Sequence, residues 1–252
     1  MKLFAILLAA TISTVAAAEA LAPAPETQAA VPAIQPAAFI RKLQAGEKVT
    51  VVTLGTSLTG GTWRWVDRMK EWLDQKWPKQ ATVHNLGVGA SASQTVPAMK
   101  GNPYTENHCG LDRIPEAIKL KPDVVLIEFS VNDAYLPYGI SLEQSKKNLN
   151  TMIDQLLAAK PDTEIIVQTM NCVINEHAKA RPDLDAYVQG YREVAAKRGL
   201  RVVDHYPNWQ KLLRENPQEF KRLVPDGIHP QAAGYSKILL PELQRALTGK
   251  AE

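Results

Sequence analysis

The sequence predicts a three-layer α/β/α sandwich built around a five-stranded, mainly parallel sheet. From residue 48 onward, apolar and β-branched runs alternate with helical patterns. The runs are apolar on both faces, as in parallel strands that helices cover on each side. With 252 residues, of which 45% are hydrophobic, the chain is long enough for one substantial core. We therefore expect a single domain over residues 39–252.

Each expected strand is a short apolar run bounded by turn residues. The five runs cover 48–54, 81–86, 123–129, 163–169 and 201–204. The helical patterns cover 63–77, 111–120, 141–160, 182–199 and 230–247. The clearest helix start is Ser141, because Gln144 follows three residues later and completes a capping-box pattern.

The first twenty residues have the features of an export signal. Lys2 precedes an apolar stretch from Leu3 to Val15, and small residues suited to cleavage follow it. The stretch is too short to favour a membrane span, so we expect no stable membrane anchor and a secreted or periplasmic protein. Residues 21–38 alternate Pro with Ala and lack aromatic residues, which predicts an extended and poorly ordered segment.

The charge pattern excludes an obvious nucleic-acid partner. The chain has 29 Lys and Arg and 26 Asp and Glu, a formal net charge of +3, and no basic run. Its two cysteines, Cys109 and Cys172, could form one disulfide in an oxidising compartment or remain buried thiols. The sequence leaves that choice and the oligomeric state open.

The stretch VVTLGTSLTGGTW, residues 51–63, has the outline of a phosphate-binding loop. Gly55 and Gly60 stand five residues apart after a predicted strand. Such a loop needs a lysine where Gly61 stands, so a nucleotide phosphate would lose its main cation. The other interpretation is that Ser57 is a nucleophile at the end of a strand.

A serine nucleophile needs a base, and the sequence has a candidate near its C-terminus. In the stretch VPDGIHP, Asp226 stands three residues before His229. An imidazole accepts the proton of a serine, and a carboxylate fixes the tautomer of the imidazole. A tight turn over residues 226–229 would bring the carboxylate to Nδ1 of His229 and leave Nε2 for Ser57. We therefore expect a catalytic triad of Ser57, His229 and Asp226.

Small or polar residues also follow the second and third strands, at the edge where open α/β sheets bind ligands. Acyl transfer passes through an oxyanion that needs hydrogen-bond donors already in place. The expected donors are the N–H of Ser57, the N–H of Gly89 or Ala90, and the side-chain amide of Asn132. We expect the neighbouring Asp133 to cap or hydrogen-bond its own loop.

At these residues the chain resembles the SGNH hydrolases, also called GDSL esterases and lipases. Their marker residues are matched by Ser57, a glycine block after the second strand, Asn132, and His229 with Asp226 at minus three. The four blocks appear in family order across residues 48–246. The resemblance implies a flavodoxin-like sandwich and the hydrolysis of esters without a metal or an organic cofactor.

The chain departs from the family pattern in two blocks. The family's Gly-Asp-Ser-Leu reads Gly-Thr-Ser-Leu at residues 55–58, which affects loop geometry more than chemistry. The usual glycine position falls on Ala90, directly after Gly89. We assign the oxyanion donor to Gly89, with Ala90 as the alternative.

Two other kinds of site fit the sequence less well. The remaining histidines are scattered, and none forms a pair at metal-ligand spacing with Cys or Glu, so we expect no metal. Glu128 and Asp133 could suggest a two-carboxylate glycosidase. However, Glu128 lies inside a predicted strand, and such a site leaves Ser57 and His229 without a role.

Export, together with the resemblance to secreted members that remove acetyl groups from polysaccharides, favours a carbohydrate acetylesterase. Trp63, Tyr135 and Tyr138 follow the serine and asparagine blocks, where aromatic rings could stack on sugars. The alternatives are a lysophospholipase or thioesterase of the same family, and a non-catalytic carbohydrate-binding accessory protein that has kept the fold.

Overall fold

The structure, a computed structural model, describes residues 35–250. The predicted signal peptide and residues 21–34 of the predicted Pro/Ala-rich segment lie outside the described residues. The last residues of that segment lie inside, and there the buried Ala37 donates its N–H to the carbonyl of Leu247 at 2.8 Å. The packed part of the chain thus includes residues before Phe39, the predicted start of the domain.

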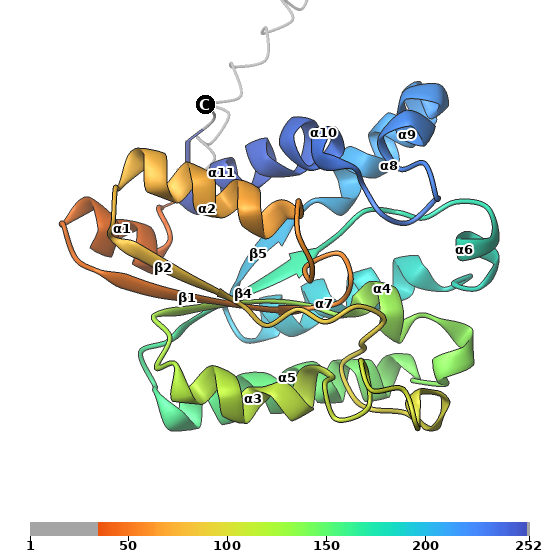
Figure 1. The fold of residues 1–252 in the computed structure, drawn as a ribbon, viewed down its shortest axis with the longest axis horizontal. Coiled ribbons are helices and arrows are strands. Elements are labelled where there is room, and N and C mark those ends of the chain that lie inside the picture. The colour runs from red at the N-terminus through yellow and green to blue at the C-terminus, as the bar shows by residue number, and fades with distance from the viewer. Residues whose placement is uncertain (1–34, 251–252) are drawn as a thin grey trace, which may run out of the picture. The chain divides into compact units, whose positions relative to one another are not determined.

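Five strands form one sheet in which every pairing is parallel (Figure 1). They are β1 (Val49–Gly55), β2 (Ala81–Asn85), β3 (Val124–Glu128), β4 (Glu164–Thr169) and β5 (Arg201–Asp204). The spatial order is β2-β1-β3-β4-β5, so β1 and β3 lie at the centre. This arrangement confirms the predicted fold class.

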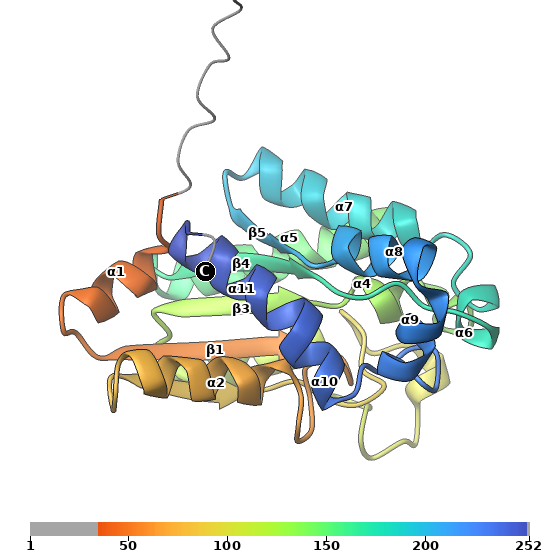
Figure 2. The ribbon, with the colours of Figure 1, turned by 90° about the horizontal axis from the view of Figure 1, so that it is seen from above.

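Helices cover the two faces of the sheet in separate layers (Figures 1 and 2). One layer contains α1 (Ala38–Gln44), α2 (Trp65–Lys76), α8 (Tyr206–Glu215), α9 (Pro217–Leu223) and α11 (Leu240–Thr248). The other contains α3 (Gly110–Lys119), α5 (Leu142–Ala159) and α7 (Leu184–Lys197). A hydrophobic core lies between the sheet and each helical layer. The central strand β3 contributes side chains to both cores, because Leu126 packs under the first layer and Ile127 under the second. Within residues 35–250, no helix has the length and hydrophobicity to cross a bilayer.

All five predicted helical patterns form helices, although the last one is interrupted. Residues 230–247 contain α10 (Ala232–Gly234), a π-helical turn labelled η3 (Tyr235–Leu239), and then α11. Pro241 lies in the first turn of α11 and has no N–H to continue the preceding helical ladder. At the start of α5, Ser141 Oγ accepts the N–H of Gln144 at 3.2 Å, whereas the Gln144 side chain bonds to Asn148. The predicted capping box is therefore half formed.

Helices α8 and α9 were not predicted from the sequence. Pro207 and Pro217 stand in their first turns. A proline is tolerated there because the first N–H groups of a helix have no partner within the helix. Asn216 caps α9, since its side chain accepts the N–H of Glu219 at 3.0 Å.

The two cysteines are both buried free thiols. Cys109 packs in a small cluster with Met99, and Cys172 packs in the core beneath the α2 and α11 layer. Burial raises the pKa of both thiols. No disulfide joins Cys109 and Cys172.

The order of the strands in the sheet determines where the site lies. From β1 the chain moves outward to β2 and then returns to β3 on the opposite side, which creates a topological switch point between β1 and β3. Gly55 and Glu128, at the carboxyl ends of these two strands, are register partners. The segments that follow carry Ser57 and Asn132, so both residues lie at the same edge of the sheet.

Candidate active site

Ser57 and His229 lie within hydrogen-bond distance, although they are 172 positions apart in the chain. The Oγ atom of Ser57 is 2.8 Å from Nε2 of His229. On the other side of the ring, Nδ1 of His229 is 2.6 Å from Oδ2 of Asp226. An ionised carboxylate only accepts hydrogen bonds, so this contact assigns the ring proton to Nδ1 and leaves Nε2 to accept from Ser57. The structure thus brings the three predicted triad residues together in the order that proton transfer requires.

The carboxylate of Asp226 also stabilises the loop that carries His229. Oδ1 of Asp226 accepts the N–H groups of Ile228 and His229 at 3.0 Å and 2.7 Å. Burial raises the pKa of Asp226, but these N–H groups and the His229 ring outweigh burial and hold the pKa below its usual value. Asp226 is therefore charged at neutral pH and fixes both the backbone and the ring of His229.

The turn that carries Ser57 is anchored from below by Glu128, a fully buried carboxyl at the end of β3. Oε1 of Glu128 accepts the N–H of Thr56 at 2.7 Å and the hydroxyl of Thr59 at 2.6 Å. Gly55 makes room for this carboxyl, because a Cβ at that position would lie 2.3 Å from the same oxygen. Burial raises the pKa of Glu128 to about 7, against the opposing effect of these hydrogen bonds.

The same contacts explain the departure from the family's Gly-Asp-Ser-Leu. The hydroxyl of Thr56 donates to Oε1 of Glu128 at 3.0 Å. An aspartate at this position would place a second carboxyl against the buried Glu128, whereas threonine supplies a donor. The substitution therefore suits the carboxyl beneath the turn and leaves Ser57 in place.

Two of the predicted oxyanion donors, Ser57 and Asn132, line one pocket. Within the described chain, the N–H of Ser57 has no hydrogen-bond acceptor. Nδ2 of Asn132 donates to the carbonyl of Ser91 at 2.8 Å, which leaves its second hydrogen free. Ala90 lines the pocket together with Ser57 and Asn132, whereas Gly89 is not among the described residues that line it. The geometry favours Ala90 as the backbone donor, and the assignment to Gly89 stays a prediction.

Ala90 has an uncommon backbone conformation for a residue with a side chain. Its φ is +57°, in the left-handed region that costs such a residue about 1–2 kcal/mol. The carbonyl of Ala90 accepts the hydroxyl of Tyr138 at 2.7 Å, which holds the peptide in place. Backbone strain of this kind is typical of functional sites.

The pocket has a cavity volume of about 330 Å³. It is lined by Ser57, Ala90, Asn132, Tyr135, Tyr138, His177, Arg181, Ile228 and His229. No sequence motif pointed to His177 or Arg181 as residues of the site. Both follow β4, the strand beside β3, so the rule that ligand sites lie at strand ends would have pointed to this segment. Burial and the nearby Arg181 lower the pKa of His177.

The glycosidase alternative has no support in the structure. Glu128 and Asp133 are both buried, and both are committed to hydrogen bonds within the protein. Asp133 accepts the N–H of Ser93 at 2.8 Å and the hydroxyl of Ser145 at 2.5 Å, so its partners lie in other segments rather than in its own loop. Neither carboxyl lines the pocket.

The glycines that resemble a phosphate loop serve a packing role. A Cβ at Gly60 would lie 2.6 Å from the carbonyl oxygen of Gly87, in the loop after β2. Glycine at position 60 therefore allows the loops after β1 and β2 to touch.

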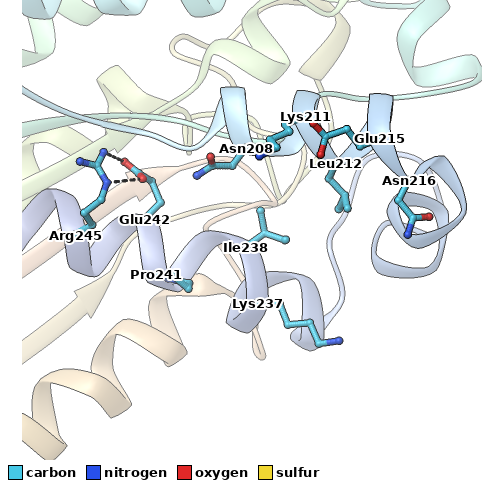
Figure 3. A pocket seen from close by; sticks show the side chains of 10 residues that line it. All are labelled: Asn208, Lys211, Leu212, Glu215, Asn216, Lys237, Ile238, Pro241, Glu242 and Arg245. Carbon is cyan, nitrogen blue, oxygen red and sulfur yellow. Dashed lines mark hydrogen bonds and ion pairs between the residues drawn. The ribbon is translucent and has the colours of Figure 1, made fainter. Parts of the chain in front are cut away.

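A larger cavity of about 440 Å³ lies between α8 and the C-terminal helical segments (Figure 3). It is lined by Asn208, Lys211, Leu212, Glu215, Asn216, Lys237, Ile238, Pro241, Glu242 and Arg245. Glu242 and Arg245 pair with each other at 2.6 Å. The lining residues include no serine, cysteine or histidine, so this cavity offers no counterpart of the Ser57–His229 pair.

A serine, a histidine and an aspartate in this arrangement, at the carboxyl edge of a parallel sheet, match the site of a serine hydrolase. Residues 38–237 match the model of the GDSL-like Lipase/Acylhydrolase family, and the chain belongs to that family. It is accordingly a carboxylic ester hydrolase of the SGNH/GDSL type, as the resemblance implied. A comparison with curated proteins finds no match.

Solved structures with the same fold include three named hydrolases. A catalytic mutant of Axe2, an acetylxylan esterase from Geobacillus stearothermophilus, is 21% identical with a TM-score of 0.61, over 80% of this chain and 94% of that one. The lipase/acylhydrolase from Enterococcus faecalis is 25% identical with a TM-score of 0.62, over 81% and 98%. LAE5, an alpha/beta hydrolase enzyme from the metagenome of Lake Arreo, Spain, is 18% identical with a TM-score of 0.60, over 80% and 95%.

Proposed function

We propose that the chain is a serine esterase that removes short acyl groups, chiefly acetyl, from carbohydrate. The observation that carries the proposal is the alignment of Ser57, His229 and Asp226 at the wall of a cavity of only about 330 Å³. A cavity of this size suits a small acyl group better than a long chain.

The first half of the reaction acylates the serine. Ser57 Oγ attacks the acyl carbon while its proton passes to Nε2 of His229, and Asp226 stabilises the resulting imidazolium. The carbonyl electron pair moves onto oxygen, where the N–H of Ser57, the amide of Asn132 and the N–H of Ala90 supply hydrogen bonds. The imidazolium then protonates the leaving alcohol as its bond to carbon breaks, and the acyl group remains on Ser57.

The second half returns the enzyme to its starting state. A water molecule attacks the acyl carbon while His229 takes one of its protons. The same donors meet the second oxyanion. When this intermediate collapses, the acid leaves and the proton on His229 returns to Ser57.

Support for a carbohydrate substrate comes from the fold and from one exposed side chain. Axe2, which shares the fold, is an acetylxylan esterase. In this chain Trp63 follows the nucleophile turn with 67% of its surface exposed, which suits stacking on a sugar ring. The guanidinium carbon of Arg68 lies 5.6 Å from the centre of the Trp63 ring, and this cation–π contact helps to position the ring.

Two assays test the proposal. We expect the purified protein to cleave p-nitrophenyl acetate, Ser57→Ala to abolish the activity, and Ser236→Ala, which changes an exposed serine, to retain it. Equal rates for Ser57→Ala and the wild type would refute the mechanism. Acetate release from acetylated xylan should then exceed the hydrolysis of lysophospholipids and acyl thioesters. A preference for either of the latter would favour lysophospholipase or thioesterase action instead.

We also propose that the protein is exported, on the basis of Lys2 and the apolar stretch from Leu3 to Val15. The test is to produce the full chain in a bacterial host with a periplasm and to measure its mass and location. A periplasmic protein that has lost about its first 18 to 20 residues is the expected result. An uncleaved protein in the cytoplasm would overturn the proposal.

A further inference from the structure

Arg181 contacts both the backbone and the side chain of the oxyanion segment. Its side chain is buried, with only 7% of the residue exposed. Nε donates to the carbonyl of Val131 at 2.7 Å, and Nη2 donates to Oδ1 of Asn132 at 3.1 Å. A single planar guanidinium therefore hydrogen-bonds to two consecutive residues at the pocket.

These contacts set the orientation of the Asn132 amide. Arginine has only donors, so the amide atom that faces Arg181 is the oxygen. The Nδ2 atom then faces the carbonyl of Ser91 at 2.8 Å, and its second hydrogen is free to serve an oxyanion. The hydroxyl of Ser91 in turn donates to the carbonyl of Gly55, which ties the amide to the strand that precedes Ser57.

Arg181 also brings an unneutralised positive charge to the pocket. Within residues 35–250, no carboxylate pairs with it. Its other neighbours are the carbonyl of His177, which accepts from Nη1 at 3.5 Å, and the ring of Tyr135, whose centre lies 4.6 Å from the guanidinium carbon. A buried cation without a carboxylate is costly, and structural arginines of this kind are usually paired. A cation bound to the Asn132 oxygen polarises the amide and strengthens its N–H groups as donors.

We propose, on the basis of the proposed esterase function, that Arg181 is a positioning residue that orients and polarises Asn132 for the oxyanion. The guanidinium acts through Asn132 and is not a binding site for an anionic substrate. Its fork is already bonded to Val131 and Asn132, and little of it is exposed.

The test is a double-mutant cycle of Arg181→Met and Asn132→Ala, with p-nitrophenyl acetate as the substrate. We expect Arg181→Met to lower kcat about 10- to 100-fold and to change KM less than about threefold, because the oxyanion forms only in the transition state. In the Asn132→Ala background, Arg181→Met should cause less than about a threefold further loss, because the residue through which it acts is already gone. Arg181→Lys, which keeps the charge but loses the fork, should recover part of kcat.

Three results would overturn the proposal. They are an unchanged kcat in Arg181→Met, losses that multiply fully in the double variant, and a rise in KM at constant kcat. Arg214→Met, on the exposed face of α8, is the matched control and should behave as the wild type. If Arg181→Met does not fold, the same cycle with Arg181→Lys decides the question.

This substrate reports ester hydrolysis alone, so the cycle does not depend on the carbohydrate preference. If Ser57→Ala is inactive while the two losses multiply, the inference about Arg181 fails and the esterase function stands.

Discussion

The carboxyl of Glu128 accepts the backbone N–H of Thr56 at 2.7 Å, directly beneath the turn that carries Ser57. Glu128 is fully buried, and the hydroxyls of Thr56 and Thr59 also donate to its Oε1 atom, at 3.0 Å and 2.6 Å. The position of the proposed nucleophile therefore depends on a carboxyl that does not line the pocket. This arrangement has a measurable consequence for stability.

We expect the stability of the folded protein to fall as pH rises from about 4.5 through about 7. Burial raises the pKa of Glu128 from 4.5 to about 7, so the folded state binds the proton more tightly than the unfolded state. The stabilisation is fully present below the unfolded pKa and is lost as pH passes the folded pKa. Each pKa unit corresponds to about 1.4 kcal/mol, so the effect at pH 8 is on the order of a few kcal/mol.

Glu128→Gln should flatten this pH dependence, because the amide has no proton to lose in this range. The measurement is urea unfolding of the wild type and the variant at pH 5 and pH 8. Burial also raises the pKa of Asp133, to about 6, so part of the slope should remain in the variant. Asp162→Asn, which changes an exposed carboxyl, is the control. Parallel stability curves for Glu128→Gln and the wild type would contradict the expectation.

Asn132→Ala should slow the turnover of p-nitrophenyl acetate by about 10²-fold or more without unfolding the protein, as the loss of an oxyanion donor usually does. Asn208→Ala, at an exposed position on α8, should leave the rate unchanged. Steady-state kinetics and circular dichroism of both variants check this. A loss smaller than about tenfold in a folded Asn132→Ala protein would remove Asn132 from the proposed role.

Trp63→Ala should raise KM for acetylated polysaccharide several-fold and leave the hydrolysis of p-nitrophenyl acetate unchanged. The exposed ring can stack on a sugar but cannot contribute to the chemistry at Ser57. Kinetics on the two substrates separate these effects. An unchanged KM for the polymer would show that Trp63 is not part of the carbohydrate-binding surface.

The sheet could be predicted from the sequence because its three central strands, β1, β3 and β4, are buried on both faces. In β3, for example, all four residues from 124 to 127 are apolar and fully buried. A continuous apolar run of this length is typical of a parallel strand. The proximity of Ser57 and His229 could be predicted for a different reason. Their residue types are dictated by acyl-transfer chemistry, and both follow predicted elements at one edge of the sheet.

The roles of Glu128 and Arg181 could not be predicted. Glu128 looks like an ordinary strand residue, and its role depends on Gly55, which faces it only in the folded sheet. The hydrogen bonds of Arg181 to Val131 and Asn132 span 50 and 49 positions of the chain, respectively. No local pattern encodes such a contact, because it arises from the way in which the loops after β3 and β4 pack.

The most direct test of the central claim is to label the nucleophile with a fluorophosphonate and to identify the modified residue by mass spectrometry. We expect one adduct, on Ser57, with labelling slowed about 10²-fold or more in His229→Ala because the serine has lost its base. An adduct on another residue, or equal labelling rates in His229→Ala and the wild type, would contradict it.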